Sequence, residues 1–567
     1  MAAPTVEPRT AGDARIAAWV ADDSRLAVGL HYVSLAAVFV VLVYLCRHEW
    51  FFGDDYKVLA LMDGRGPAGF FEPFAEHWLT VPKAIAQLEL GTVGFRSYWP
   101  TILLLVGVQV VSGHLLWRLL RQMGIAAWIA TGLAAAYLVG AGDTLILGTL
   151  QVGWIGAIAL GLLVILLVNH HGEDRRRDLA GAALATLALL FHSGIAIAML
   201  VPATLVALLR RGVRGALVQA VPPLAVYGLW FVLTGRNRRE AGPTGIGLGE
   251  VPRFVATELI DGLSDVVRLA PVLVVLALVA LGAWLLRNAR VARTRAAPAF
   301  AMAVGAVVVY LVVALGRGEA TYRYAYLAWL LVLPAFALAL EHLGRRAPWR
   351  CVIGVAVSAA IGLVGIREFR QVTQNARSLQ QGFRSDLLAV ADRTRTEGSV
   401  PRAEIDNIDA PLVRVRNVVD WRDRDKFESL RPGSAEQWRE LAPRLQVRFA
   451  RAAPATIRGG ERPVVRTVRG GAVDPAGAGC VAVRPDGARV ALGLTVPELA
   501  ALRVRGGDRV TVELPEASTE GEIARGGHDV PRTGTEYVEL APGTDPVLVV
   551  HGSRPATVCG VRLDAAE

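Results

Sequence analysis

Long apolar runs separated by short polar breaks dominate the first two thirds of the chain. From Leu26 to Ile366 these runs are roughly 16 to 22 residues long, and after Arg367 they stop and charged residues become dense. A helix rises about 1.5 Å per residue, so about 20 apolar residues cross a hydrocarbon core roughly 30 Å thick. Only helices and closed barrels satisfy their backbone hydrogen bonds there, and these runs are too long and too uniformly apolar for barrel strands. The sequence therefore predicts a polytopic α-helical membrane protein with the lipid bilayer as a partner.

We expect about eleven membrane-spanning helices, the fifth and sixth of them short. Their approximate ranges are 26–45, 98–120, 125–142, 148–168, 178–191, 194–209, 215–234, 270–286, 298–315, 324–341 and 351–366. The first run lacks an A-x-A-like cleavage site after it, so it is interpreted as a retained anchor behind a cytoplasmic tail, residues 1–25. His192, Ser193 and Gly194 form the predicted break between the fifth and sixth helices.

Arginine clusters decide the predicted orientation. The net charge is +10, and arginines cluster after the second, fourth, sixth and eighth predicted helices and between the tenth and eleventh. All of these clusters fall on one side if the count is right, and the positive-inside rule makes that side cytoplasmic. The loop at 46–97 and everything after Arg367 would then lie outside the cytoplasmic (inner) membrane. Because the basic charge is explained by topology, no nucleic-acid partner is expected.

The first outer loop carries ionisable side chains beside the membrane. Asp54 and Asp55 lie in an aromatic stretch just after the first helix, and Glu76, His77 and Lys83 follow further on. Taken alone, the adjacent acids are best explained as caps of a helix N-terminus. Acids, a histidine and a lysine in one such loop are also what glycosyl transfer needs. An acid removes the acceptor's proton, and a metal ion or a cationic side chain neutralises the departing phosphate.

These segments resemble the motifs of the GT-C superfamily of membrane glycosyltransferases. The resemblance rests on Phe52-Gly53-Asp54-Asp55-Tyr56, Glu76-His77-Trp78 with Pro82, Gln151-Val152-Gly153-Trp154, and Arg317 with Tyr322-Arg323-Tyr324. It covers the layout of residues 26–366 and is nearest to actinobacterial members that carry a C-terminal β-domain. It implies a GT-C-like catalytic membrane domain that takes its sugar from a polyprenyl-phosphate donor.

The resemblance also implies roles for individual residues. Asp54 or Asp55 would be the catalytic base, with Asp54 preferred. The substrate-binding residues would be Glu76, His77, Lys83, Gln151, His192, Arg317, Arg323 and Tyr324. Arginine suits a lipid phosphate because its planar fork matches phosphate geometry, although cations and tyrosines at helix ends also serve as interfacial anchors. Whether a divalent cation such as Mg²⁺ or Mn²⁺ binds at Asp54, Asp55, Glu76 and His77 stays open, because nothing in the sequence fixes their geometry.

The leading hypothesis is an inverting hexosyl- or pentosyltransferase. It would transfer a sugar to an envelope glycan, glycolipid or protein acceptor outside the cytoplasm. The alternatives are a transporter or flippase of a lipid-linked intermediate, and a non-catalytic scaffold for envelope assembly. A transporter would predict charges deep within the spans and internal repeats, and the sequence has neither. The polar Gln109 and His114 inside the second span are interpreted as helix–helix hydrogen bonds.

The region after the membrane part divides into a helical or mixed linker region, 367–445, and a β-rich region, 446–567. Leu379, Phe383, Leu387 and Val390 are spaced for one helical face, which predicts a helix over 375–394. Strand-like runs follow at Arg462–Val468, Cys480–Arg484, Arg489–Leu494, Asp508–Leu514, Glu536–Leu540, Val547–Val550 and Thr557–Leu563.

Many short strands with turn signals predict an antiparallel sandwich or jelly roll. Carbohydrate binding by this domain is suggested by analogy with the family, and a packing role is the alternative. Cys480 and Cys559 lie in separate strands of the exported region. Because an oxidising exterior permits disulfides, we expect these two cysteines to be joined.

Overall fold

The computed structural model describes residues 12, 15, 25–51, 53–62, 65–74, 77–139, 148–237, 246–267, 271–272, 275, 279, 282–283, 296–316, 322–346, 348–397, 404–405, 413, 415–427, 445–446, 448–450, 457–459, 464–469, 471–476, 480–486, 489–495, 500–506, 509–514, 524–529, 535–540, 547–551 and 555–563. The chain forms two compact units. The membrane unit comprises Met1–Glu49, Arg65–Gln87 and Tyr98–Arg377, and the C-terminal unit comprises Trp50–Gly64, Leu88–Ser97 and Ser378–Glu567.

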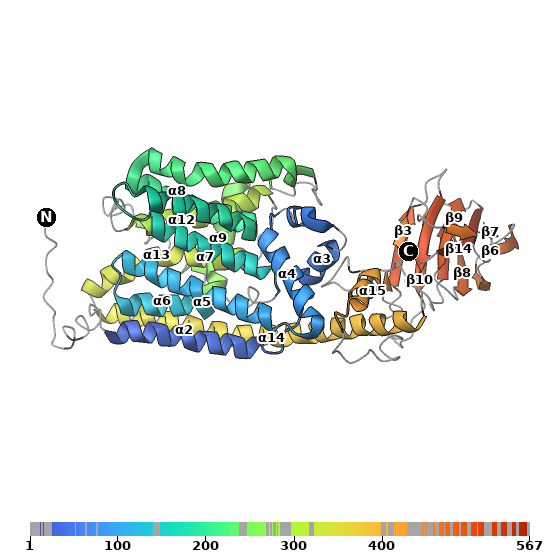
Figure 1. Ribbon diagram of the computed structural model, residues 1–567, viewed down its shortest axis with the longest axis horizontal. Coiled ribbons are helices and arrows are strands. Elements are labelled where there is room, and N and C mark those ends of the chain that lie inside the picture. The colour runs from blue at the N-terminus through green and yellow to red at the C-terminus, as the bar shows by residue number, and fades with distance from the viewer. Residues whose placement is uncertain are drawn as a thin grey trace. The chain divides into compact units, whose positions relative to one another are not determined.

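Among the described residues, six helices of the membrane unit are long and apolar enough to cross a membrane. They are α2 (Arg25–Cys46), α5 (Trp99–Gln122), α7 (Gln151–Val168), α8 (Arg175–Leu233), α12 (Ala297–Gly316) and α13 (Tyr322–Arg346). They run alongside one another together with the shorter α6 (Ala127–Val139) (Figure 1). α7 packs against both α5 and α8, and most of its side chains are buried. The helical membrane part predicted from the apolar runs is therefore present.

The predicted spans map onto fewer helices mainly because three of them fall within α8. This helix has non-helical backbone at His192 (φ −161°, ψ 103°) and at Gly212 (φ 70°, ψ −164°), close to where the predicted spans end. The positive φ at Gly212 is a conformation that glycine adopts without strain. The predicted span at 125–142 corresponds to the shorter α6, and the one at 270–286 lies largely outside the described residues.

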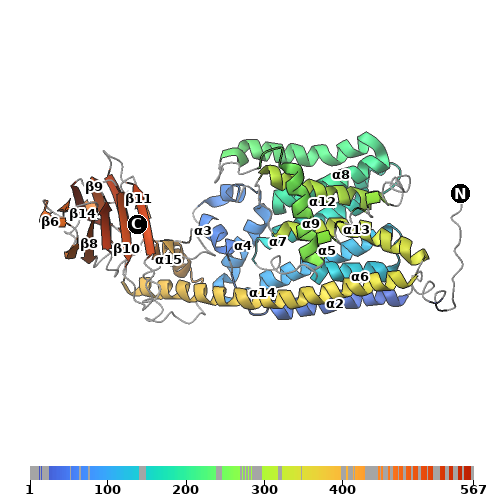
Figure 2. The same ribbon diagram turned by 180° about the vertical axis from the view of Figure 1, so that it is seen from behind.

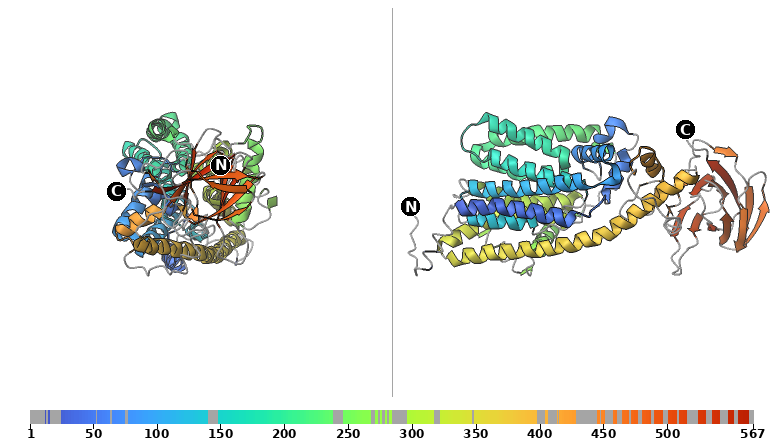
Figure 3. Two further views of the ribbon diagram at one scale, coloured as in Figure 1. Left: turned by 90° about the vertical axis from the view of Figure 1, so that its right-hand side faces the viewer. Right: turned by 60° about the horizontal axis from the view of Figure 1, so that its bottom comes forward.

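The last predicted span and the amphipathic helix predicted after it form one element, α14 (Pro348–Glu397), seen as one long helix in Figure 3. We predicted separate segments at 351–366 and 375–394. The residues between them contain no glycine or proline to end a helix, so the helix continues. Phe383, Leu387 and Val390 are buried, as their helical spacing predicts, whereas Leu379, predicted on the same face, is exposed.

Polar side chains within the membrane helices link one helix to another. Gln109 Nε2 on α5 donates to the Tyr326 hydroxyl on α13 at 2.5 Å. His114, also on α5, shares a hydrogen bond with His31 on α2, with 3.1 Å between Nδ1 and Nε2. The interpretation of Gln109 and His114 as helix–helix contacts is therefore confirmed.

Shorter elements complete the helical parts of both units. They are α3 (Asp54–Met62), η1 (Gly66–Phe70), α4 (Thr80–Thr92), η2 (Gly94–Arg96), η3 (Gly235–Asn237), α9 (Val251–Val267) and α15 (Val415–Asp423). α9 packs against both α12 and α13. Part of the segment between α2 and α5, including α3 and η2, thus belongs to the C-terminal unit, whereas η1 belongs to the membrane unit.

Aromatic side chains form the core of the helical part of the C-terminal unit. Tyr56 on α3 packs against Phe383 on α14, with ring centroids 4.5 Å apart. Phe95 packs against Trp421 on α15 at 5.1 Å, and its backbone N–H donates to the Lys426 carbonyl at 3.0 Å. Segments that precede α5 in the sequence therefore fold together in this unit with segments that follow α13.

The rest of the C-terminal unit is antiparallel β-structure (Figure 2). One sheet contains, in spatial order, β11 (Ala524–Asp529), β10 (Arg509–Leu514), β13 (Val547–His551), β8 (Arg489–Thr495) and β5 (Val464–Arg469). The other contains β3 (Arg448–Ala450), β12 (Thr535–Leu540), β9 (Ala500–Gly506), β14 (Ala556–Leu563), β7 (Cys480–Pro485) and β6 (Gly471–Pro475), with β4 (Ile457–Gly459) paired to β14. A separate pair joins β1 (Glu404–Ile405) to β2 (Leu445–Gln446).

The two larger sheets contribute to one hydrophobic core. Its members include Val483 on β7, Leu492 on β8, Val504 on β9 and Val550 on β13, all fully buried. Each of the predicted strands matches an observed strand to within two residues. Several strands were missed, among them β9, β11 and the short β3 and β4, which lie among glycines, charged residues and prolines.

Cys480 on β7 and Cys559 on β14 are register partners on adjacent strands and are joined by a disulfide. The predicted pair is therefore present. The bond closes a loop with a sequence separation of 79 residues and links β7 to the last strand of the chain, β14.

Candidate functional site

Four aromatic side chains from four separate segments of the membrane unit form a row in which each ring contacts the next. The His77 and His192 rings lie 4.3 Å apart between centroids, and Trp154 meets His192 edge-on at 5.1 Å. Tyr324 then packs against Trp154 at 5.5 Å. We call His77, Trp154, His192 and Tyr324 the histidine cluster. Its members come from the segment before α4, from α7, from the break in α8 and from the start of α13.

The break in α8 fixes the tautomer of His192. The residue has extended backbone, and its Nδ1 accepts a hydrogen bond from the backbone N–H of Ile195 at 3.3 Å. This is the geometry of an N-cap, in which a side chain satisfies a free backbone donor of the following helical stretch. Because Nδ1 is the acceptor, the neutral ring carries its proton on Nε2. His192 therefore presents a donor at its other nitrogen.

The neighbours of the two histidines hold the loop against the break. The Trp78 backbone N–H donates to Ser193 Oγ at 3.0 Å, and the Ser193 N–H donates back to the Trp78 carbonyl at 3.3 Å. Trp78 also stacks on Trp230 of α8 at 5.1 Å, with the rings nearly parallel. The Trp230 Nε1–H donates to the Phe71 carbonyl at 2.8 Å. The sequence marked Ser193 only as part of the break and did not single out Trp230, since a tryptophan near the end of a span is typical of an interfacial belt.

Two glycines allow the close approach of these segments. A Cβ added at Gly194 would lie 2.9 Å from His77 Cε1. A Cβ added at Gly153 would lie 2.9 Å from Pro82 Cγ and 2.5 Å from the Phe191 carbonyl oxygen. All three distances are too short for a side chain without movement, so the packing of α7, α8 and the loop depends on glycine at these positions.

Lys83 has a structural environment that the sequence did not predict. Its side chain is buried, and its ammonium donates to the carbonyls of Gly69 at 2.9 Å and Glu72 at 2.6 Å. Arg65 forms an ion pair with the Glu72 carboxylate in the same loop. Lys83 was predicted to contact a phosphate, with interfacial anchoring as the alternative, and the phosphate contact stays a prediction; in the structure its ammonium contacts the backbone of Gly69 and Glu72.

Of the remaining predicted substrate residues, Gln151 and Arg323 lie within the described part of the chain. Gln151 begins α7 and is buried, and its Oε1 has no hydrogen-bond partner within the described part of the chain. Arg323 is half-buried in the first turn of α13, directly before Tyr324 of the cluster. Glu76 and Arg317 lie outside the described residues.

The two candidate catalytic acids belong to the C-terminal unit, in the first turn of α3. Asp54 is 40% exposed and forms an ion pair with Lys57 at 2.9 Å. Asp55 is only 1% exposed. Beside it, burial and then the Asp55 charge raise the pKa of the Tyr56 phenol well above its ordinary value, while Arg384 opposes the shift. Asp54 is thus the acid that solvent reaches, and Asp55 is part of the packed interior.

The described residues do not form a set that fits a divalent cation. Nowhere within the described ranges do three or more His, Cys, Asp or Glu side chains gather closely enough to hold a metal ion. Asp54 is paired with a lysine, and His77 contacts another histidine.

Comparisons with protein-family models, with curated proteins and with solved structures gave no significant match.

Proposed function

We propose that the protein is a membrane glycosyltransferase that moves a sugar from a polyprenyl-phosphate donor to an envelope glycan, glycolipid or protein acceptor. The observation that supports this best is the histidine cluster. It gathers His77, His192 and Tyr324, three of the residues chosen from the sequence as substrate contacts, in one part of the membrane unit. The resemblance to the GT-C superfamily supplies the donor class.

The cluster has the chemistry that a lipid-linked sugar phosphate requires. A neutral His192 would donate from Nε2 to a phosphate oxygen or a sugar hydroxyl, because its Nδ1 is occupied by the backbone of Ile195. Arg323, next to Tyr324, would provide the positive charge and the forked donor geometry that phosphate favours. The aromatic faces of Trp154 and Tyr324 would pack against the apolar face of a sugar ring.

The reaction would be a direct displacement at the anomeric carbon. Asp54, the exposed acid, would accept the proton of the acceptor hydroxyl as its oxygen forms the new bond. The bond between the anomeric carbon and the phosphate oxygen would break, and its electron pair would leave with polyprenyl phosphate. One displacement inverts the anomeric configuration, so the product would have the opposite configuration to the donor.

Following the arginine clusters, the protein would cross the cytoplasmic membrane about eleven times, with its C-terminal unit on the extracytoplasmic side. The two antiparallel sheets would form a sandwich-like domain. This domain would bind the carbohydrate part of the acceptor, as domains in that position do in the family.

A complementation experiment tests the proposal. A deletion strain would carry the wild-type gene, Asp54→Asn or Asp55→Asn, and its glycans and lipid-linked sugars would be analysed. We expect the donor to accumulate and the glycosylated product to be lost with Asp54→Asn. Asp474→Asn is a matched control, because Asp474 is 49% exposed and ion-paired in the same unit. Full rescue by both Asp54→Asn and Asp55→Asn, at wild-type protein levels, would refute the enzymatic role.

A further inference from the structure

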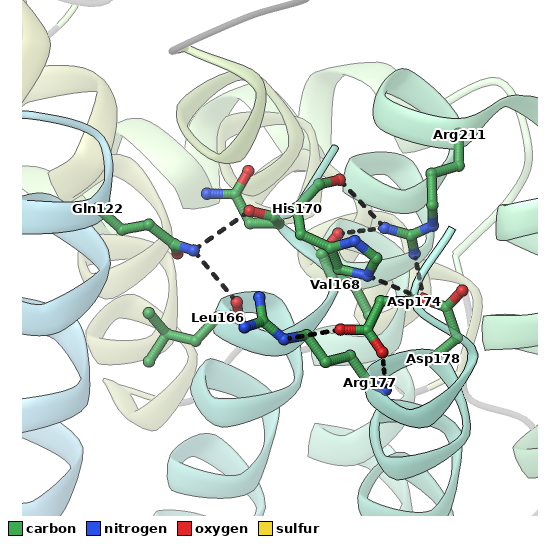
Figure 4. Close-up of polar contacts among 9 residues, drawn as sticks. Gln122, Leu166, Val168, His170, Asp174, Arg177, Asp178 and Arg211 are labelled. Carbon is green, nitrogen blue, oxygen red and sulfur yellow. Dashed lines mark hydrogen bonds and ion pairs between the residues drawn. The ribbon is translucent and has the colours of Figure 1, made fainter. Parts of the chain in front are cut away.

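A dense polar network joins the end of α7 to α8 (Figure 4). Arg211 donates from Nη1 to the Val168 carbonyl at 2.6 Å, capping the last turn of α7. Its Nη2 lies 2.9 Å from Asp178 Oδ1, and His170 Nε2 lies 3.2 Å from the same oxygen. These contacts fix the connection between the two helices and the position of the first turns of α8.

Positive charge is in excess at this end of the helices. Residues 169–178 and 210–214 contain six arginines and three carboxylates. Each carboxylate has an arginine partner: Asp178 pairs with Arg211, Asp174 with Arg177, and Glu173 with Arg214. The acids are therefore already neutralised by the protein, and a net charge of three remains for an external partner.

Arg175 and Arg176 carry much of this excess. Both lie in the first turn of α8, both are exposed, and neither has an ion-pair partner in the described part of the chain. Leu179 follows on the same helical face and is 53% exposed, and Ala183 and Leu187 continue that exposed face. We call Arg175, Arg176, Leu179, Ala183 and Leu187 the arginine–leucine stripe. It places two cations at one end of an apolar strip.

We propose that the arginine–leucine stripe binds an anionic phospholipid. The guanidinium groups of Arg175 and Arg176 would hold the headgroup phosphate, since arginine pairs with phosphate in a bidentate manner. The acyl chains would lie along Leu179, Ala183 and Leu187. A zwitterionic headgroup would bring its own cation to the same place and bind less well. The stripe thereby selects the lipids next to the protein, independently of any reaction at the histidine cluster.

Native mass spectrometry of the full-length protein tests this proposal. Detergent-solubilised protein would be titrated with dioleoyl-phosphatidylglycerol or dioleoyl-phosphatidylcholine, and the bound lipid counted. We expect a preference for phosphatidylglycerol. Arg175→Gln/Arg176→Gln should weaken that preference by about fivefold for each arginine removed, the effect of one basic residue near an anionic surface. Arg175→Lys/Arg176→Lys should retain most of it, because the charges remain.

The control variant is Arg253→Gln, which removes an exposed arginine from α9. It should leave the lipid preference unchanged, and all variants should melt near the wild-type temperature because the altered side chains are exposed. Arg176→Gln alone provides a milder variant if the double substitution melts early. The proposal is overturned if the glutamine variants keep the wild-type preference, or if Arg253→Gln lowers it equally. It is also overturned if excess inorganic phosphate displaces the lipid, which would indicate a site for a free anion.

Discussion

The imidazole rings of His77 and His192 lie 4.3 Å apart, and the residue that follows each one carries the hydrogen bonds that hold them together. Trp78 and Ser193 exchange two hydrogen bonds, at 3.0 and 3.3 Å. The contact therefore depends on two hydrogen bonds, one to the Ser193 side chain and one between backbones, and not on the rings alone. Its geometry depends on the local conformation at the break in α8, which His192 itself caps.

Substituting His192 separates its capping role from its proposed substrate role. His192→Ala removes the cap and should cost about 1 kcal/mol of stability, whereas His192→Asn retains an N-capping side chain. If the ring contacts substrate, both variants lose glycosylation in the complementation assay while only the alanine variant melts earlier. Thermal unfolding in detergent provides the stability measurement. Wild-type product levels with His192→Asn would show that the ring is not needed by the substrate.

Gly194 offers a second way to disturb the cluster without touching a polar group. In Gly194→Ala the new Cβ would meet His77 Cε1 at 2.9 Å, so the ring or the loop must shift. We expect a loss of about 1 to 3 kcal/mol, as for other overpacked sites, together with reduced activity. Gly107→Ala on α5 is the control, since nothing lies within 4 Å of its added Cβ. Equal melting temperatures for the two variants would contradict the close packing described for His77.

The sequence predicted the membrane helices and most strands because their signals are local. Apolar runs, alternating residues such as Val510, Val512 and Leu514, and turn residues act over a few positions. The pairing of Cys480 with Cys559 could also be anticipated, because the compartment and the number of exported cysteines left one choice. The break at His192 could be predicted because His192, Ser193 and Gly194 interrupt the apolar sequence with two polar residues and a glycine.

The environment of Lys83 could not be predicted in the same way. Its partners are backbone carbonyls of Gly69 and Glu72, and carbonyls leave no pattern in a sequence. A lysine near a membrane surface is equally compatible with phosphate binding and with interfacial anchoring. The hydrogen bond from the Trp230 indole N–H to the Phe71 carbonyl could not be predicted either, because it joins segments that are far apart in the chain.

Lys83→Met tests the structural role of this lysine. Methionine keeps the length and packing of the side chain but removes the donors to the Gly69 and Glu72 carbonyls. Charge-assisted hydrogen bonds of this kind contribute about 1.5 to 3 kcal/mol, so we expect a clear fall in melting temperature. Tryptic cleavage after Arg65 should become faster as the loop loosens. An unchanged melting temperature combined with weaker donor binding would instead favour the phosphate role predicted from the sequence.

Two buried tyrosines give a matched pair with opposite expected effects. The Tyr56 hydroxyl is buried and has no hydrogen-bond partner in the described part of the chain, whereas the Tyr137 hydroxyl lies 3.1 Å from Ser112 Oγ. Tyr56→Phe removes an unsatisfied polar group and should be neutral or stabilising by about 1 kcal/mol. Tyr137→Phe removes a made bond and should cost about 1 kcal/mol.

The Tyr56 variant should also change the response to alkali. Burial raises the pKa of the Tyr56 phenol, so the unfolded chain releases this proton at a lower pH than the folded chain does. The folded state therefore loses stability as the pH rises past about 10, the ordinary value for tyrosine. Tyr56→Phe removes this contribution, and unfolding in denaturant at neutral and alkaline pH should show a shallower decline than in the wild type. An identical decline in both proteins would mean that the Tyr56 phenol titrates normally and that its surroundings are more open to water than its packing against Phe383 implies.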